Sequence, residues 1–88
     1  MKHYDEIIVG AGSAGAVIAA RLSQTPDRQV LLLEAGPDYP SVEQTPEDLR
    51  DPWISLVAHD WGFNASAAPG REFPYPRGKV TGGSSAVN

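Results

Sequence analysis

Residues 7–15 read Ile-Ile-Val-Gly-Ala-Gly-Ser-Ala-Gly, an apolar run that passes directly into a G-x-G-x-x-G pattern. The run ends a segment, residues 4–9, that has the composition of a buried strand. From residue 13 to residue 24 apolar side chains recur at helical spacing. Pro26 ends that helix because proline cannot continue the hydrogen-bond ladder. The stretch therefore predicts a strand, a glycine-rich turn and a helix in immediate succession.

A second strand follows the predicted helix. Residues 29–34 contain the continuous apolar run Val-Leu-Leu-Leu, which is typical of strands covered by helices on both faces of a parallel sheet. Strand, helix and strand in this order form a βαβ unit with a right-handed crossover. The predicted fold class is α/β, with an incomplete Rossmann-like βαβ unit over residues 1–36. A two-stranded parallel sheet leaves both edges uncovered, so we expect further strands from a downstream segment or another chain.

The glycines of the first glycine loop, residues 10–15, have separate expected roles. Gly10 permits the tight turn, Gly12 lets the backbone approach a pyrophosphate, and Gly15 allows close packing of helix on strand. The backbone amides near Ser13 and Ala14 then point at the phosphates, which the positive end of the helix dipole also favours. The alternative is that these glycines serve packing alone, without a ligand.

Glu34 is the second feature of a dinucleotide site. It lies 22 positions after Gly12, at the end of the second predicted strand. A carboxylate at this place accepts hydrogen bonds from a ribose 2′-hydroxyl and repels a 2′-phosphate. With strand, helix, second strand and terminal acid in register, the sequence predicts dinucleotide binding, but this pattern alone does not separate FAD from NAD.

Composition and charge argue against several other classes. The chain has 88 residues, a net charge of −4 and no cysteine, so we expect neither a nucleic-acid surface nor a disulfide or thiolate site. Only two histidines are present, His3 and His59, which is too few for a zinc centre. No segment approaches the roughly 20 apolar residues of a membrane span, and Asp5 and Glu6 interrupt any signal-peptide core. We expect a soluble cytoplasmic protein without a metal site. One basic cluster is present, made of Arg71, Arg77 and Lys79. An acidic residue, prolines and glycines lie among these side chains and dilute their positive charge.

The connector, residues 37–76, is rich in glycine and proline. Residues 45–48, Thr-Pro-Glu-Asp, predict a helix start with a capping threonine, a proline at the first helical position and acids in the first turn. Residues 51–52, Asp-Pro, repeat the signal, so a second short helix is expected over residues 53–59. From residue 60 to residue 76 we expect only turns and extended chain. Three side chains are expected to pack on one face of the second helix: Trp53, Leu56 and Val57.

Several polar side chains of the N-terminus and the connector have ordinary structural interpretations. His3 is predicted to be a surface residue, and His59 a packing or helix-end histidine rather than a catalyst. Four acids are expected to form a solvated, capping face: Glu43, Glu47, Asp48 and Asp51.

The C-terminal motif, residues 77–88, reads Arg-Gly-Lys-Val-Thr-Gly-Gly-Ser-Ser-Ala-Val-Asn. Its residues 82–85 form a glycine turn that leads into hydroxyls at a predicted helix start, which is a second natural anion-binding arrangement. We expect the first glycine loop and this motif to close around one diphosphate-bridged cofactor.

At this point the chain resembles the glucose–methanol–choline (GMC) oxidoreductases, FAD enzymes that mostly oxidise alcohols. Three features match in order: the first glycine loop with Leu-Glu-Ala-Gly at residues 33–36, the Asp-Trp pair at residues 60–61, and the Arg-Gly-Lys…Gly-Gly-Ser-Ser…Asn block. The resemblance covers nearly the whole chain. Thr81 departs from it, because family members often carry an aliphatic residue there.

The resemblance implies FAD as cofactor and assigns it contacts. Ser84 and Asn88 would contact the phosphate–ribityl–flavin portion, Val80 and Gly83 would offer backbone contacts, and Trp61 would lie near the adenine end. The alternatives are a plain core aromatic for Trp61, helix capping for Ser84 and Ser85, and a turn residue for Asn88. The full predicted FAD-binding set is Gly10, Gly12, Ser13, Ala14, Gly15, Glu34, Ala35, Trp61, Val80, Gly83, Ser84 and Asn88.

The resemblance also implies a reaction, in which a histidine base takes the hydroxyl proton of an alcohol while a hydride passes to flavin N5. That base lies near the C-terminal end of such enzymes, so no catalytic residue is expected in residues 1–88, and the substrate domain would belong to the remainder of the enzyme. Three alternatives stay open: a non-redox relative such as a lyase or decarboxylase, an NAD-dependent Rossmann enzyme, and a small binding module without catalysis.

Overall fold

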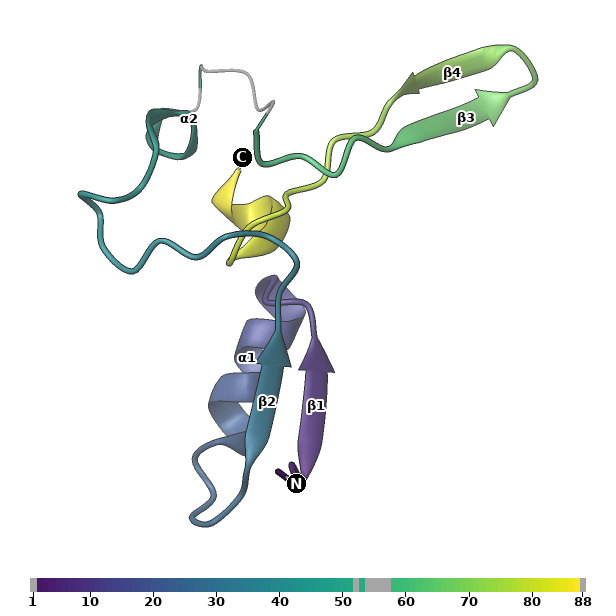
Figure 1. The fold of residues 1–88 in the computed structure, drawn as a ribbon. Helices are drawn as coiled ribbons and strands as arrows, with labels where there is room; N and C mark the ends of the chain where they lie inside the picture. Colours follow the sequence, from purple (N-terminus) through teal and green to yellow (C-terminus); the bar gives the residue numbers. More distant parts are fainter. Residues whose placement is uncertain (1, 52, 54–57, 88) are drawn as a thin grey trace.

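The computed structural model describes residues 2–51, 53 and 58–87. Its N-terminal part is the predicted βαβ unit, made of β1 (Glu6–Val9), α1 (Ser13–Leu22) and β2 (Val30–Leu33). The two strands pair in parallel, from Glu6 opposite Val30 to Val9 opposite Leu33. Figure 1 shows them side by side with α1 packed against them. The predicted Rossmann-like α/β class is confirmed, with each element shorter by one or two residues at the predicted ends.

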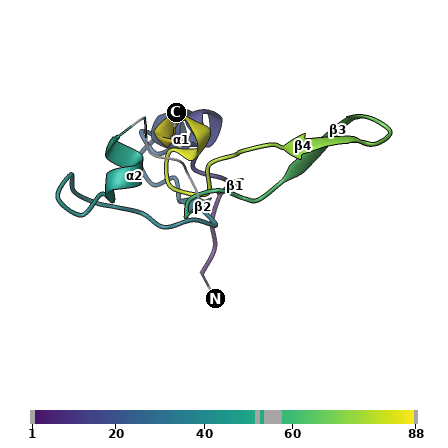
Figure 2. The same cartoon turned by 90° about the horizontal axis from the view of Figure 1, so that it is seen from above.

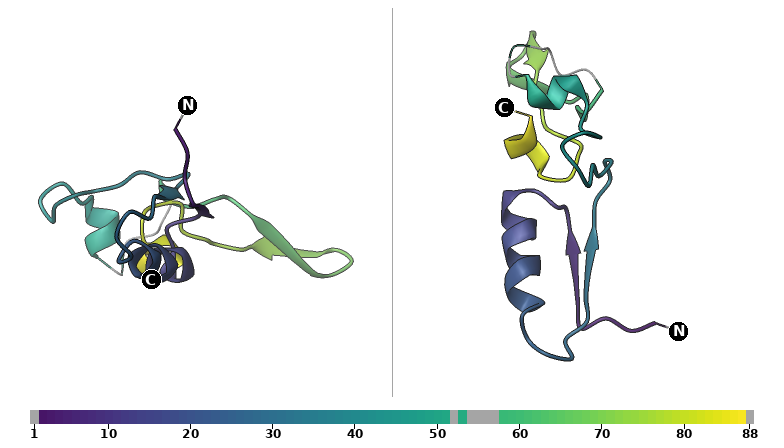
Figure 3. Two further views of the ribbon diagram at one scale, coloured as in Figure 1. Left: turned by 90° about the horizontal axis from the view of Figure 1, so that it is seen from below. Right: turned by 90° about the vertical axis from the view of Figure 1, so that its left-hand side faces the viewer.

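One face of the two-stranded sheet has no cover within the described residues. The right-hand view of Figure 3 shows α1 on one side of β1 and β2 only. Val9 at the end of β1 is 83% exposed, and Ile7 and Leu33 on the same face are also exposed. The radius of gyration is 16.0 Å, whereas a compact domain of this length has about 12 Å. The residues described here therefore leave apolar surface uncovered.

The most buried side chains lie away from the sheet, where distant parts of the chain meet. Ala11 of the first glycine loop and Val80 of the C-terminal motif are each 2% exposed. The one-turn 3₁₀ helix η1 (Gly83–Ala86) lies at the N-terminal end of α1, as Figures 1 and 3 show. The core of this chain is thus the junction between the first glycine loop and the C-terminal motif.

The connector contains one short helix, α2 (Glu47–Arg50). The helix falls where residues 45–48 predict it, but the predicted cap is wrong. The residue before the helix is Pro46, and the Thr45 hydroxyl donates instead to the Ser41 carbonyl oxygen at 2.9 Å. The expected second helix falls largely outside the described residues, as do Leu56 and Val57. Trp53 is described and is 93% exposed, so it does not pack as predicted.

The prediction of turns and extended chain over residues 60–76 missed the pairing of two extended segments. Strands β3 (Asn64–Ala68) and β4 (Arg71–Pro74) form an antiparallel hairpin, with an irregular register between Ser66 and Ala68. Figures 1 and 2 show this hairpin as an arm that extends away from the βαβ unit, opposite to α2. Its tip is Pro69-Gly70, and Gly70 has a φ of +77°, the positive value that such turns need at glycine. Among the described residues no helix is long and apolar enough to cross a membrane.

Candidate cofactor-binding site

The first glycine loop and the C-terminal motif are in direct contact. The Gly82 amide donates to the Ala11 carbonyl oxygen at 2.7 Å, and the hydroxyls of Ser13 and Ser85 share a hydrogen bond. A Cβ added to Gly83 would lie 2.9 Å from the Cα of Gly12. A side chain at Gly83 would therefore push the two segments apart. Ser13 and Ser85 are 72 positions apart in the sequence. The first glycine loop and the C-terminal motif nevertheless pack directly against each other.

The geometry of the first glycine loop explains two of its glycines. Gly10 has a φ of +97°, a value that residues with a side chain rarely adopt, and its amide donates to the Leu33 carbonyl oxygen at 2.7 Å. A Cβ on Gly15 would lie 1.8 Å from the Gly10 carbonyl oxygen. The tight turn at Gly10 and the close helix packing at Gly15 are thus as predicted.

Glu34 has a structural role that the sequence interpretation missed. One carboxylate oxygen accepts a hydrogen bond from the Ala11 amide at 2.8 Å, and the other accepts one from the Gly36 amide at 2.8 Å. The side chain thus ties the first glycine loop to the end of β2. Because an ionised carboxylate has about four acceptor positions, Glu34 retains capacity for a ribose hydroxyl.

The C-terminal motif is seated against the chain that follows β2. The Thr81 amide donates to the Pro37 carbonyl oxygen at 3.0 Å. A Cβ on Gly36 would lie 2.0 Å from the Lys79 carbonyl oxygen, and one on Gly78 would lie 2.5 Å from the Gly83 carbonyl oxygen. Both glycines are required here because backbone packs directly on backbone. The structure confirms the predicted helix start as the single turn η1.

Ser84 does not cap η1. No side-chain cap hydrogen bond is present at the start of this helix, and the Ser84 hydroxyl instead accepts from the Gly78 amide at 3.1 Å. The helix-capping interpretation of Ser84 is therefore not supported, and its hydroxyl lies at the cleft described next.

A cleft of about 350 Å³ opens between the two segments. Its volume is within the range of roughly 300–1,000 Å³ of small-molecule sites. Seven residues of the predicted FAD-binding set line it: Gly10, Gly12, Glu34, Ala35, Trp61, Gly83 and Ser84. Three further lining residues are Val9, Arg77 and Gly78. Four predicted residues do not line it, namely Ser13, Ala14, Gly15 and Val80, and Asn88 lies outside the described residues.

Arg77 is a cleft residue that the charge argument discounted. Its guanidinium carbon lies 3.6 Å from the centroid of the Tyr75 ring, and its backbone amide donates to an Asp60 carboxylate oxygen at 2.8 Å. The sequence signal was present in the Arg-Gly-Lys block, but the acidic net charge obscured it. A single arginine beside a glycine-lined cleft can bind a phosphate without altering the overall charge balance.

Trp61 lines the rim of the cleft and is not a core residue. Its side chain is 43% exposed and stacks on Phe63 with ring centroids 5.6 Å apart. The Lys79 ammonium lies 4.9 Å from the centroid of the Trp61 ring. The core-aromatic interpretation is therefore wrong for Trp61, which lines the cleft with its ring between these contacts and solvent.

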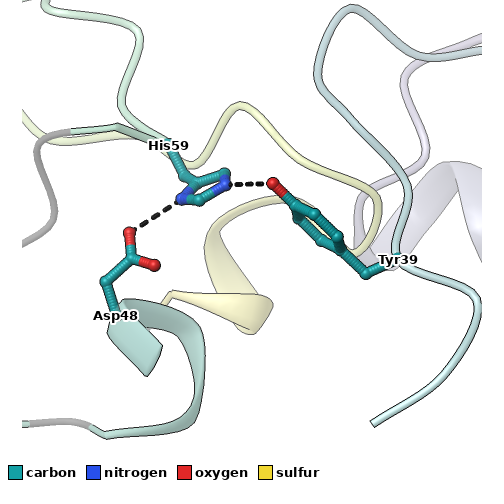
Figure 4. A network of polar contacts seen from close by, with 3 residues as sticks. All are labelled: Tyr39, Asp48 and His59. Carbon is teal, nitrogen blue, oxygen red and sulfur yellow. Dashed lines mark hydrogen bonds and ion pairs between the residues drawn. The ribbon is translucent and has the colours of Figure 1, made fainter. Parts of the chain in front are cut away.

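His59 is the packing histidine that the sequence predicts. It is 4% exposed, and Figure 4 shows its ring between Tyr39 and Asp48. The Tyr39 hydroxyl lies 2.8 Å from Nε2, and an Asp48 carboxylate oxygen lies 2.8 Å from Nδ1. The prediction of a solvated face is therefore wrong for Asp48. His3 is exposed, as predicted.

Comparisons with known proteins agree with this architecture. Residues 8–75 match the model of the NAD(P)-binding Rossmann-like domain family. The chain is 50% identical over 91 residues to an oxygen-dependent choline dehydrogenase of Vibrio vulnificus, which aligns 99% of this chain with 16% of the relative. It is 46% identical to a pyridoxine 4-oxidase of Microbacterium luteolum, with 100% of this chain and 18% of the relative aligned.

Solved structures show the same correspondence. The crystal structure of pyridoxine 4-oxidase from Mesorbium loti superposes with a TM-score of 0.79 at 38% identity, over 98% of this chain and 17% of that one. A formate oxidase of Aspergillus oryzae, studied for the modification of its FAD, superposes with a TM-score of 0.76 at 35% identity, over 99% of this chain and 16% of that one. The chain thus spans about one sixth of the length of these relatives.

Proposed function

Because this chain belongs to the NAD(P)-binding Rossmann-like domain family and corresponds to the N-terminal segment of the GMC oxidoreductases, we propose that it binds FAD. We further propose that it does so within a longer enzyme that oxidises an alcohol. The observation that carries the proposal is the cleft shared by the first glycine loop and the C-terminal motif. Relatives are named for choline and pyridoxine, and others for formate, so the alcohol substrate class belongs to the proposal.

The residues around the cleft fit a dinucleotide. Gly10, Gly12, Gly78 and Gly83 line it, so backbone rather than side chains borders the space that a diphosphate would occupy. The start of α1 favours negative charge there, because the positive end of the helix dipole points toward it. Arg77 adds one cationic side chain at the same cleft. We propose that these groups hold the pyrophosphate, with the amides near Ser13 and Ala14 as predicted donors.

We assign the residues around the cleft to the two ends of the cofactor from the resemblance to the GMC oxidoreductases. Glu34 would accept a hydrogen bond from the adenosine ribose, and Ala35 would lie beside it. Trp61 would flank the adenine side, since it lines the cleft. Gly83 and Ser84, which line the cleft, would contact the flavin side. The family resemblance adds Val80 and Asn88 to this proposal. Flavin supplies the redox chemistry when it is bound, and this chain supplies binding and orientation.

The uncovered face of β1 and β2 supports a place within a longer protein. Ile7, Val9 and Leu33 leave an apolar surface exposed on this face in the residues described here, and a two-stranded sheet is not independently stable. We propose that further strands of the same enzyme cover it. This observation counts against a self-sufficient binding module.

The proposal is tested on the full-length protein that contains this segment. We expect the purified protein to show the two visible absorption bands of oxidised flavin and to release FAD on denaturation. Anaerobic addition of an alcohol substrate should bleach these bands. Release of NAD instead would support the second candidate, which the NAD(P) description of the matching family favours. A bound flavin that no alcohol reduces would contradict the oxidation part and favour a non-redox relative.

A matched variant tests the cleft itself. A Cβ on Gly12 would lie 3.9 Å from the Cα of Gly83, which is an ordinary contact. Gly12→Ala therefore adds a methyl group between the two segments without displacing backbone. We expect an apoprotein with an unchanged melting temperature and an FAD affinity at least tenfold weaker. Unchanged FAD affinity would place the diphosphate elsewhere.

A further inference from the structure

His59 joins three parts of the chain that lie far apart in the sequence. Its ring contacts Tyr39, which follows β2, and Asp48 in α2, through two hydrogen bonds of 2.8 Å each. The rings of His59 and Tyr39 also meet edge to face, with centroids 5.6 Å apart. Figure 4 shows the three side chains together in the connector. We call this set the histidine cluster.

The hydrogen bonds of the histidine cluster are mutually consistent. The Asp48 carboxylate is an acceptor, so the proton of the ring lies on Nδ1. In a neutral imidazole Nε2 is then an acceptor for the Tyr39 hydroxyl, and in a protonated one Nε2 donates to the Tyr39 oxygen. Both polar positions of a buried ring are thereby satisfied. Such a cluster specifies one arrangement of the surrounding chain, because each missing partner would leave a buried polar group without a hydrogen bond.

The backbone of His59 extends this arrangement to the C-terminal motif. The Lys79 amide donates to the His59 carbonyl oxygen at 2.8 Å, and the Trp61 amide donates to the Arg77 carbonyl oxygen at 3.0 Å. Asp60 and Gly78 form an antiparallel bridge between these two contacts. Residues 59–61 therefore pair with residues 77–79 on one side.

The other side of the C-terminal motif rests on the chain that carries Tyr39. The Thr81 amide donates to the Pro37 carbonyl oxygen at 3.0 Å, and Gly36 packs against the Lys79 carbonyl group. Residues 77–81 are thus held between residues 36–37 and residues 59–61. The histidine cluster is the side-chain link that ties these two flanking segments to each other.

We propose that the histidine cluster is a positioning device that holds the C-terminal motif in its cofactor-binding place, an inference that rests on the proposed FAD-binding function. None of its three residues is among those that line the cleft, so His59 acts through residues 77–81 and not by contact with the cofactor. Loss of the cluster leaves the first glycine loop intact but lets the other half of the site move. The expected consequence is weaker and faster-dissociating FAD.

The test measures FAD binding to apoprotein prepared from the full-length protein, by flavin fluorescence at a temperature well below the melting temperature. His59→Phe retains the ring volume and removes both side-chain hydrogen bonds. We expect its dissociation constant for FAD to rise about tenfold or more, since the cluster loses two buried hydrogen bonds. Tyr39→Phe removes a single hydroxyl and should give a smaller rise. His3→Phe is the matched control at an exposed histidine and should bind FAD as the wild type does.

Conservative variants separate positioning from general stability. His59→Asn retains a donor near Nδ1, and His59→Gln retains a polar group near Nε2, so both should recover part of the FAD affinity that His59→Phe loses. A His59→Phe apoprotein that melts at a lower temperature but binds FAD with the wild-type dissociation constant would overturn the proposal. If His59→Phe does not fold, Tyr39→Phe decides by the same criterion. A wild-type apoprotein that does not bind FAD would refute the proposed function before any variant is compared.

Discussion

The junction of the first glycine loop with the C-terminal motif and the hairpin arm β3–β4 both use glycine, but for different physical reasons. At the junction, backbone lies against backbone, so that a Cβ on Gly83 would lie 2.9 Å from the Cα of Gly12. The segments that build the junction are packed in the same way, since a Cβ on Gly15 or Gly36 would meet a carbonyl oxygen at 1.8 Å or 2.0 Å. At the tip of the arm, Gly70 has no atom within 4 Å of such a Cβ, and only its φ of +77° favours glycine. Glycine provides close approach in the first region and a backbone conformation in the second. The same substitution should therefore have very different effects in the two regions.

The largest effect is expected for Gly15→Ala. The new methyl group would overlap the Gly10 carbonyl oxygen, so α1 must move away from the turn that follows β1. Overpacking of this kind costs about 3 kcal/mol or more when the obstructing atom is backbone. We expect the full-length protein to lose bound FAD and to unfold at a much lower urea concentration. A Gly15→Ala protein that retains FAD and its wild-type midpoint would show that α1 is not tightly packed against the turn at Gly10.

Glu34→Ala should have the next largest effect. The substitution leaves the amides of Ala11 and Gly36 without their acceptor, at a cost of roughly 1–3 kcal/mol for each part-buried donor. Glu34→Gln retains one acceptor oxygen and should fall between Glu34→Ala and the wild type. The measurements are the urea midpoint and the FAD dissociation constant, with the exposed Glu43→Ala as control. Equal behaviour of Glu34→Ala and Glu43→Ala would contradict the role of Glu34 in the junction.

A moderate and local effect is expected for Gly70→Ala in the arm. Alanine at a positive φ costs about 1 kcal/mol, and nothing near Gly70 would be displaced. Because the arm extends away from the βαβ unit (Figure 2) and none of its residues lines the cleft, FAD affinity should not change. Fluorescence titration with FAD checks this expectation. A loss of affinity similar to that of Gly12→Ala would show that the arm supports the site.

The same contrast explains what the sequence could predict. The periodicity of residues 13–24 and the glycines at positions 10, 12 and 15 are local signals, and they predicted the βαβ unit and its turn. Contact between the first glycine loop and the C-terminal motif was also predictable, because both patterns suit one diphosphate. Glycines at close contacts leave a recognisable pattern in the sequence, since no other residue fits there.

Side-chain contacts over long separations were not predictable in this way. Asp48 and His59 are 11 residues apart, and Tyr39 and His59 are 20 apart, with no periodicity that relates them. The hairpin was missed because β3 consists mainly of alanine, serine and asparagine, which are poor strand formers. Its one clear signal was Pro69-Gly70 between two short segments. Tertiary pairing decided the outcome at these positions.

The smallest effect is expected for Ser85→Ala, which asks whether side chains help to hold the junction. The hydroxyls of Ser13 and Ser85 are exposed and bond to each other, so water can replace either partner, and the net loss should be about 0.5 kcal/mol. The backbone bond from Gly82 to Ala11 remains in this variant. The FAD dissociation constant and the urea midpoint should therefore stay close to those of the wild type. A tenfold loss of FAD affinity would mean that the two hydroxyls, rather than close backbone packing, join the two segments. The junction would then differ from the arm in its side-chain contacts and not in the role of its glycines.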